Sequence, residues 1–282
     1  MDLQSLEIRI ARSENLPVLP QIVSQVMKVA DDPAASAREM ERCIEMDPAI
    51  TAKVLRVANS SYYGLSQVPS VSRAVSVLGM NAIRSLVIGV AFQQIIAARS
   101  VANRFNKLEF WRHSLGVAIC SRILGKLKCP QQSEELYVAG MMHDVGILAM
   151  DRFNPLELNK AIGFAIEERM KLHEAEQLLF GFDHSELGSL LGARWCLTPA
   201  VCRAIQYHHD PLLDSEEHLA SLIVGLSDQV AHQCGLTNNV PGNPVVLDEA
   251  LIAKLDIPLE QLEIIKPIVI QEISRAEEAF GI

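Results

Sequence analysis

Helix start signals are the feature of this sequence that most restricts its fold. Ser36-x-x-Glu39 and Asp183-x-x-Glu186 have the pattern of a capping box, in which two side chains satisfy the first amides of a helix. Asp47-Pro48 and Thr198-Pro199 each place a capping residue before a proline, which is favoured in the first helical turn. Each signal fixes the start of a helix within a residue or two.

Apolar residues recur at helical spacing along nearly the whole chain, whereas alternating, strand-like runs are short and rare. We therefore predict an all-α protein built as a multi-helix bundle. Hydrophobic residues make up 49% of the 282, which is enough to bury a sizeable core. The predicted helices span residues 2–12, 20–31, 36–46, 48–59, 71–79, 81–98, 106–127, 134–149, 156–171, 174–180, 184–195, 199–208, 216–234, 248–255 and 259–280.

The chain has no Gly/Ser-rich or Pro-rich stretch that would mark a hinge, so we expect tightly packed subdomains. Residues 235–244 have the turn chemistry of a loop and separate a C-terminal helical pair from the rest. We predict an N-terminal helical subdomain over residues 1–105, a middle subdomain over residues 106–235 and the C-terminal pair over residues 236–282.

Charge and cysteine content exclude several classes of protein. The formal net charge is −9 and the lysines and arginines are scattered, so the basic patch of a DNA- or RNA-binding protein is missing. We expect no direct nucleic-acid partner, although a nucleotide ligand stays open. The six cysteines form no C-x-x-C pair, which argues against a zinc ribbon or a thioredoxin-like motif. We expect reduced and mostly buried thiols.

Neither a targeting segment nor a membrane span is predicted. The first residues, Met1 to Gln4, lack the basic region and apolar core of a secretory signal, so we expect a cytoplasmic protein. The most apolar window, residues 86–98, is interrupted by Gln93 and Gln94 and is shorter than the roughly 20 residues that a spanning helix needs. It predicts a buried helix and no membrane association.

The segment Met142-His143-Asp144-Val145-Gly146 carries the clearest chemical signal. An apolar helix arrives here at two adjacent side chains that can both bind a metal ion. A neutral imidazole and a carboxylate can hold one divalent cation, and the carboxylate can bridge to a second. Taken alone, such a pair more often caps a helix or faces water.

The surroundings of this pair strengthen the metal interpretation, because further histidines and aspartates fall on separate predicted helices. Ligands from different helices that converge inside a bundle are the usual way in which helical proteins build dinuclear sites. The alternative is that each histidine is separately solvated or hydrogen-bonded in the core. The candidate metal ligands are His113, His143, Asp144, His184, His208, His209 and Asp228.

Three other histidines have no such context. We predict that His173, His218 and His232 are surface residues. His232 lies one helical turn after Asp228, so a supporting contact to that carboxylate is the alternative for this residue.

Several segments together resemble the HDOD family, the HD-related output domains. The resemblance covers about residues 16–232. It is carried by Leu16-Pro17-Val18-Leu19-Pro20, Asp47-Pro48-Ala49-Ile50-Thr51, Leu55-Arg56-Val57-Ala58-Asn59-Ser60, Ala74-Val75-Ser76-Val77-Leu78-Gly79, Ala139-Gly140-Met141-Met142-His143-Asp144, Glu186-Leu187-Gly188, Trp195 and His208-His209.

The resemblance implies an HD-domain-like bundle with two metal sites. In the wider HD superfamily, a first histidine, the His-Asp pair and a late aspartate hold a metal that activates water. By resemblance, this first set consists of His113, His143, Asp144 and Asp228. The HD-GYP cyclic-dinucleotide phosphodiesterases add three histidines for a second metal, which correspond to His184, His208 and His209.

Two departures from the HD-GYP pattern bear on activity. Those enzymes have a lysine after His-Asp-x-Gly, where this chain has Ile147, and their Gly-Tyr-Pro motif is missing because His208-His209 runs into Asp210-Pro211. The metal ligands are therefore present while the substrate clamp is not. HDOD proteins resemble signalling modules of bacteria, and that expectation sets the leading function.

Two functions stay open at this point, beside a third interpretation in which the chain is a purely structural helical scaffold. The first is a regulatory module whose metal site serves to bind a signalling protein or a small phosphate or nucleotide ligand. The second is an active metal-dependent phosphohydrolase, in which Asp144 would be the catalytic residue. Resemblance favours Fe or Mn as the metal, and Zn, Ni or Mg are alternatives. The sequence does not encode the oligomeric state.

Overall fold

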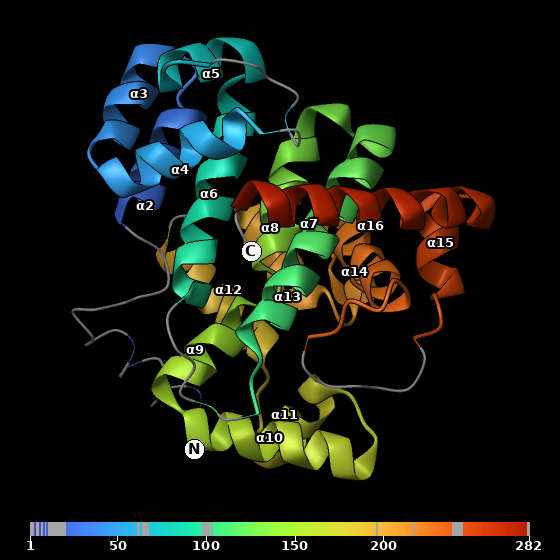
Figure 1. The fold of residues 1–282 in the computed structure, drawn as a ribbon. Coiled ribbons are helices and arrows are strands. Elements are labelled where there is room, and N and C mark those ends of the chain that lie inside the picture. The colour runs from blue at the N-terminus through green and yellow to red at the C-terminus, as the bar shows by residue number, and fades with distance from the viewer. Residues whose placement is uncertain are drawn as a thin grey trace. The chain divides into compact units, whose positions relative to one another are not determined.

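The computed structural model describes residues 3, 6, 8, 10, 21–60, 63, 68–97, 102, 104–195, 197–216, 218–238 and 245–280. Every regular element in these ranges is a helix, and no strand occurs among them, which confirms the all-α class (Figure 1). Of the helix predicted over residues 2–12, only residues 3, 6, 8 and 10 are described, and they are helical.

The helices account for most of the described residues. Their bounds are α2 (Gln21–Asp31), α3 (Ala37–Glu45), α4 (Pro48–Ala58), α5 (Val71–Leu78), α6 (Met80–Ala97), α7 (Lys107–Lys128), α8 (Ser133–Met142), α9 (Val145–Phe153), α10 (Pro155–Glu168), α11 (Leu172–Phe180), α12 (His184–Arg194), α13 (Pro199–Tyr207), α14 (His218–Gln233), α15 (Glu249–Leu255) and α16 (Leu259–Phe280). Two short 3₁₀ helices, Pro130–Gln132 and Pro211–Leu213, precede α8 and α14.

The predicted start signals are observed as caps. Ser36 and Glu39 form the complete capping box of α3. The carboxylate of Asp47 accepts hydrogen bonds from two amides at the start of α4, and the hydroxyl of Thr198 accepts one at the start of α13. Asp183 caps α12 through the amides of residues 185 and 186. These local hydrogen bonds explain why the helix starts were readable from the sequence.

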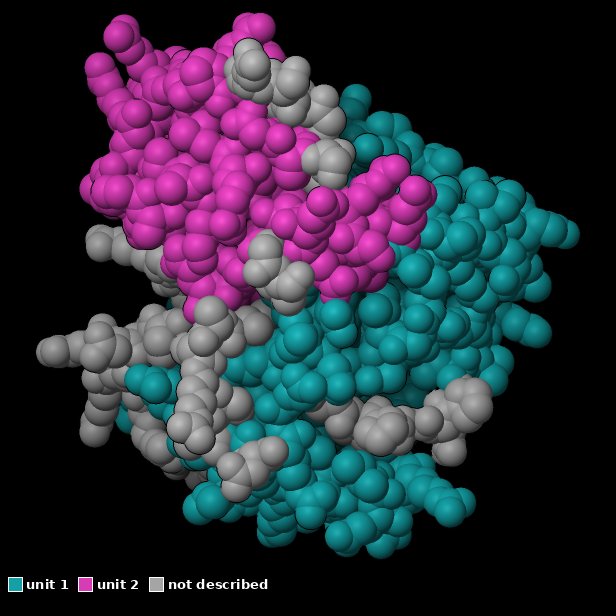
Figure 2. Space-filling view, viewed as in Figure 1, with its two compact units in different colours: residues 1–16, 98–270 teal, residues 17–97, 271–282 magenta. Residues whose placement is uncertain are grey.

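The chain forms two compact units (Figure 2). Unit 1 comprises residues 1–16 and 98–270, and unit 2 comprises residues 17–97 and 271–282. Helix α16 contributes its residues up to 270 to unit 1 and the remainder to unit 2. The partition predicted from the sequence into residues 1–105, 106–235 and 236–282 is a different division and stays a prediction.

Unit 1 contains the candidate metal ligands. Its centre is formed by α7, α8 and α14, which pack on one another, while α13 contacts both α8 and α14. Helix α12 packs against α13 and α9, and α10 and α11 pair with each other. The long helix α7 buries most of its length, including the aromatic side chains of Phe110 and Trp111.

The single helix predicted over residues 134–149 is wrong, because the chain breaks at the His-Asp pair. Helix α8 ends at Met142 and α9 begins at Val145. Asp144 has φ −96° and ψ 13°, outside the helical range, and its carbonyl accepts the amide of Ile147 three residues on. Periodicity alone could not show this break, since the residues on both sides are apolar and helix-forming.

Glycines allow the helices to approach closely on both sides of this break. A Cβ atom added to Gly146 would lie 1.9 Å from the carbonyl oxygen of His184, and one added to Gly140 would lie 2.8 Å from the Cα atom of Ala118. Neither distance is compatible with a real side chain. The two glycines therefore bring α9 against α12 and α8 against α7, which places His113, His143 and His184 near one another.

Unit 2 explains part of the N-terminal sequence signature. The amide of Asn59 holds the chain after α4, because its Nδ2 donates to the carbonyl of Val68 at 3.0 Å and its Oδ1 accepts the Val68 amide at 2.7 Å. Arg56 Nη2 donates to the carbonyl of Phe280 at 3.2 Å. These polar residues thus join Val68 and the end of α16 to α4 within the same unit.

Two further expectations can be compared with the described residues. None of the described helices combines the length and the apolar character needed to cross a membrane. Cys43, Cys120, Cys129, Cys202 and Cys234 are free thiols, and Cys196 lies outside the described residues. Only Cys43 and Cys120 are buried, so the expectation of mostly buried thiols is not met among the described cysteines. Burial raises the pKa of the Cys120 thiol to about 12.

Candidate metal centre

The structure brings all seven predicted ligands together at the centre of unit 1. They come from five different places in the fold. His113 lies on α7, His143 and Asp144 lie at the α8–α9 break, and His184 begins α12. His208 and His209 follow α13, and Asp228 lies on α14. His113, His143 and Asp144 are completely buried.

Four side chains form what we call the first donor set: His113, His143, Asp144 through Oδ2, and Asp228. His113 Nε2 lies 3.1 Å from both His143 Nε2 and Asp228 Oδ1. Asp144 Oδ2 lies 3.2 Å from His143 Nε2 and 3.5 Å from His113 Nε2. Donors about 2.1 Å from a common metal ion are themselves about 3.0–3.5 Å apart, so this spacing fits one ion.

The second donor set consists of His184, His208, His209 and the other carboxylate oxygen of Asp144. Asp144 Oδ1 lies 3.0 Å from His184 Nε2 and 3.4 Å from His208 Nε2. His184 Nε2 lies 2.9 Å from His209 Nε2. Asp144 therefore stands between the two sets and directs one oxygen at each, which is the geometry of a bridging carboxylate.

Backbone carbonyls hold three of the imidazoles in one tautomer. Nδ1 of His113 contacts the carbonyl of Leu236 at 3.0 Å, and Nδ1 of His143 contacts that of Gly140 at 2.7 Å. Nδ1 of His208 contacts the carbonyl of residue 205 at 2.7 Å. Because a carbonyl only accepts, each Nδ1 carries the hydrogen, and each Nε2 presents its lone pair to the centre. Such lone pairs repel one another at about 3 Å unless a cation lies between them.

Several polar atoms of the centre are buried without a partner that has hydrogen-bond geometry. Among the described residues these include Asp144 Oδ1, His208 Nε2 and Asp228 Oδ1. Leaving such atoms unsatisfied is costly, and a charged carboxylate is the most costly of them. Metal coordination would satisfy all three atoms. The donors present, five imidazoles and two carboxylates, therefore fit a pair of divalent ions.

The electrostatics of the centre favour ionised carboxylates. Burial by itself would raise the pKa of Asp144, but the imidazole of His143 and then those of His184 and His208 lower it well below its usual range. Burial also opposes ionisation of Asp228, and the neighbouring imidazoles of His232 and His113 hold the pKa of that carboxyl below its ordinary value. Both groups are then available as anionic ligands.

Sequence reasoning missed Glu176, which lies on α11 and is buried. Its Oε2 accepts hydrogen bonds from His184 Nδ1 at 2.6 Å and from the His184 amide at 2.9 Å. Burial would lower the pKa of His184, but the charge of Glu176 and the contact with Asp144 raise it well above its ordinary value. A signal was available, since Glu176 falls on the apolar stripe of its helix with Leu172 and Ala175.

The prediction that His173 and His232 are surface residues is wrong. His173 is half-buried and stacks on His209 with ring centroids 3.7 Å apart, and burial lowers its pKa to about 3. His232 is half-buried, and its Nε2 lies 3.4 Å from Asp228 Oδ1, which agrees with the supporting contact given as the alternative. The side chain of His218 lies outside the described residues.

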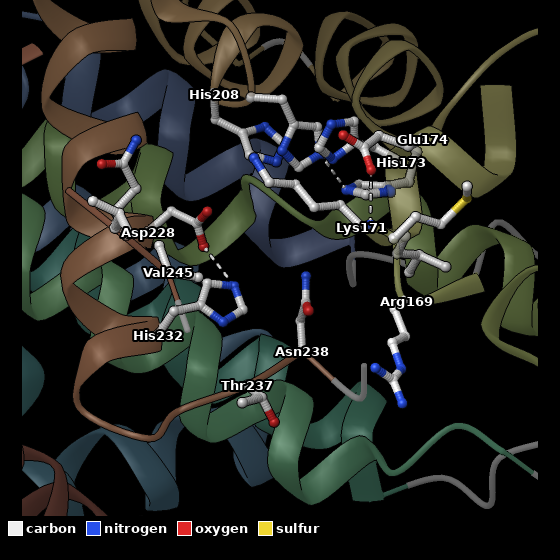
Figure 3. Close-up of a pocket in the computed structure, with 16 residues that line it drawn as sticks. Arg169, Lys171, His173, Glu174, His208, Asp228, His232, Thr237, Asn238 and Val245 are labelled. Carbon is white, nitrogen blue, oxygen red and sulfur yellow. Dashed lines mark hydrogen bonds and ion pairs between the residues drawn. The ribbon is translucent and has the colours of Figure 1, made fainter. Parts of the chain in front are cut away.

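A cavity of about 460 Å³ opens onto this centre (Figure 3). The second donor set contributes His184, His208 and His209 to its wall, and the first contributes Asp228. Asn238 also lines it, and its Nδ2 donates to Asp144 Oδ2 at 3.0 Å. The volume is that of a small-molecule site, so a ligand in the cavity would contact both donor sets.

Similar proteins are found among solved structures. An HDOD domain protein of unknown function from Geobacter sulfurreducens matches with a TM-score of 0.83 at 23% identity, over 99% of this chain and 98% of that one. A protein from Shewanella amazonensis SB2B, named as a candidate phosphohydrolase, matches with a TM-score of 0.75 at 22% identity, over 98% of each chain. At these identities the likeness concerns the fold.

Two longer proteins match as well. A candidate signal transduction protein from Marinobacter aquaeolei VT8 has a TM-score of 0.80 at 21% identity, over 99% of this chain and 64% of that one. An uncharacterised protein of Treponema pallidum is 21% identical over 71% of this chain, which spans only 38% of that protein's length. The model of the HDOD domain matches residues 16–211, which is more than half of the sequence. The chain therefore belongs to the HDOD family.

Proposed function

We propose that this protein is a cytoplasmic regulatory module of the HDOD type that holds two divalent metal ions in unit 1 and uses the cavity beside them to bind a small ligand. The observation that carries the proposal is the position of Asp144, whose two oxygens face two separate sets of imidazoles. A carboxylate that only capped a helix or filled the core would need no such arrangement. Its signalling partner is a protein that responds to the state of the cavity.

The donor types restrict which metals fit. Five of the seven ligands are imidazoles and two are carboxylates, a mixed set that accepts iron, manganese, zinc and nickel, whereas magnesium prefers oxygen ligands and near-octahedral geometry. Family resemblance favours iron or manganese within that group. When bound, two such ions can lower the pKa of a coordinated water and polarise a phosphoryl oxygen. The imidazoles would fix the position of each ion, and Asp144 would bind both ions and fix the distance between them.

We favour ligand binding without hydrolysis because of the residue at position 147, Ile147. The HD-GYP phosphodiesterases that this chain resembles have a lysine at this position, which can neutralise a phosphate. Ile147 is completely buried within α9 and offers no charge to the cavity. A ligand can therefore be held at the centre while the hydrolytic apparatus is incomplete.

Metal analysis of protein purified without chelator tests the proposal. We expect about two transition-metal ions per chain, lost together in Asp144→Ala, while circular dichroism shows that the variant keeps its helices. Protein that contains no metal and cannot be reconstituted with iron, manganese, zinc or nickel would contradict it.

A metal-dependent phosphohydrolase is the second candidate. It is favoured by the cavity, which exposes members of both donor sets to a ligand, and by relatives that are named as candidate phosphohydrolases. The two candidate functions differ in whether the protein hydrolyses its ligand. Metal-loaded protein is incubated with cyclic dinucleotides, nucleotides and simple phosphoesters. Hydrolysis that Asp144→Ala abolishes would establish the enzyme, whereas binding without product supports the regulatory module.

A further inference from the structure

Two cations stand at the cavity beside the metal centre. Arg169 and Lys171 lie on the turn between α10 and α11, and both line the cavity. Figure 3 shows them on the side opposite Asp228 and His232. Both are exposed, in a chain whose formal net charge is −9. This pair was not predicted, because the turn carries no recognisable sequence motif.

The backbone of Arg169 has a conformation that few residues with a side chain adopt. Arg169 ends α10 in the left-handed conformation, with φ 54° and ψ 42°. Glycine adopts this conformation readily, whereas a Cβ atom disfavours it. The next helix, α11, ends in the usual way with Gly181 at φ 76°. An arginine at the equivalent position one helix earlier is strained, and Asp256 at the end of α15 shares this conformation, so it is the place of Arg169 at the cavity that favours a role for its side chain.

The charge distribution around the cavity suits an anion. Two divalent ions, Arg169 and Lys171 together carry six positive charges, against five on the nearby carboxylates of Asp144, Asp183, Glu174, Glu176 and Asp228, so the loaded cavity would carry one excess positive charge. Glu174, the acidic residue on the same turn, uses its Oε2 to accept the amide of Lys171 at 2.9 Å. The N-terminus of α11 adds its partial positive charge on this side of the cavity.

We propose that Arg169 and Lys171 form a clamp for the phosphoryl group of the cavity's ligand, and that they replace the cation that Ile147 does not supply. This inference rests on the proposed function, since the ligand is expected to lie between the clamp and the metal centre. The cavity volume of about 460 Å³ admits a mononucleotide as well as inorganic phosphate. Met170 and Val245 line the same cavity and give an uncharged part of a ligand apolar contact.

Isothermal titration calorimetry of metal-loaded protein with inorganic phosphate tests the clamp. Lys171→Gln and Arg169→Gly should each weaken phosphate binding about fivefold or more, because each removes a charge-assisted hydrogen bond. Lys160→Gln is the matched control, since Lys160 is an exposed cation of α10 that does not line the cavity. Arg169→Gly should keep or raise the melting temperature, because glycine relieves the left-handed backbone. A second series with adenosine monophosphate distinguishes a nucleotide from free phosphate as the source of the phosphoryl group.

The outcomes separate this inference from the proposed function. If the wild-type protein contains no metal, the proposed function fails. If the protein is metal-loaded but binds neither probe, or binds both equally well in Lys171→Gln, Arg169→Gly and Lys160→Gln, the clamp is wrong while the metal centre stands. Selective loss in the first two variants, with unchanged metal content, supports the clamp.

Discussion

Glu176 accepts two hydrogen bonds from the same residue, one from the Nδ1 atom of His184 at 2.6 Å and one from its backbone amide at 2.9 Å. The carboxylate therefore fixes both the ring and the start of α12. Because Nδ1 donates to Glu176, Nε2 of His184 is left to face Asp144 and His209. This is the carboxylate-histidine arrangement that commonly supports a metal ligand.

Replacing Glu176 with glutamine should weaken the second donor set. The amide can present either oxygen or nitrogen to His184, so the tautomer is no longer fixed, and we expect metal affinity to fall about 10- to 100-fold. The measurement is a competition titration with a metal indicator. Glu174→Gln on the same helix is the control, because Glu174 caps the Lys171 amide and does not contact His184. Equal affinity in both variants would show that Glu176 does not support a ligand.

Substitutions in the two donor sets should have different effects on metal content. Asp228→Asn touches only the first set and His209→Gln only the second, so each should retain about one metal ion per chain. Asp144→Asn removes the carboxylate that both sets share and should lose both ions. Elemental analysis after gel filtration gives the stoichiometry. Loss of a single ion in Asp144→Asn would mean that this carboxylate does not bridge.

Gly146→Ala should be strongly destabilising. The added Cβ would lie 1.9 Å from the carbonyl oxygen of His184, a backbone atom that cannot move alone, so we expect a loss of about 3 kcal/mol or more in the free energy of unfolding. Gly163→Ala in α10 is the control, because its Cβ would meet Arg104 only at 3.6 Å. That variant should gain about 0.5–1 kcal/mol from helix propensity. Urea denaturation measures both, and similar values for the two variants would contradict the close packing of α9 on α12.

The capping box of α3 gives a pH-dependent contribution to stability. Hydrogen bonds from the Ser36 amide and hydroxyl lower the pKa of Glu39 from its ordinary value of 4.5. The unfolded chain therefore binds this proton more readily than the folded protein, so the stabilisation is present above pH 4.5 and is lost as the pH falls through the lowered value.

A double-mutant cycle of Ser36→Ala and Glu39→Ala, followed by urea denaturation at several pH values, isolates the part of this contribution that depends on the Ser36 hydroxyl, since alanine keeps the backbone amide. We expect a coupling free energy at about pH 7 that declines toward zero as the carboxyl is protonated. A coupling that is constant with pH would show that the hydrogen bonds do not depend on the charge of Glu39.

Local signals accounted for much of the fold. The caps at Ser36, Asp47 and Thr198 depend on hydrogen bonds within a few residues, and the structure confirms the helix starts that they predict. The break at Asp144 could not be predicted in this way, because it depends on the packing of α9 against α12, a contact between residues far apart in the sequence. The division into two units likewise depends on contacts between distant parts of the chain, because the last residues of α16 belong to unit 2 together with residues 17–97.

The candidate site was predictable to the extent that its side chains are metal-binding types on separate helices. These side chains meet around Asp144 because α7, α8, α12 and α14 pack together. The family resemblance implied this packing, whereas the composition of the sequence did not. Glu176 was missed although its place on the apolar stripe of α11 was a usable signal. The cations of the α10–α11 turn were missed because surface cations are common throughout the chain, and their position becomes informative only once the cavity is known.

At the break between α8 and α9, the stability of a continuous helix and the geometry of the metal ligands are conflicting requirements. On an unbroken helix, adjacent side chains diverge by about 100°, so His143 and Asp144 could not both face one point. Substitutions that extend helical structure through residues 142–146 would strengthen the backbone there and at the same time rotate one of the two groups out of the centre. Selection for thermal stability alone would therefore erode this site. Selection for metal binding would instead preserve the break in the helix.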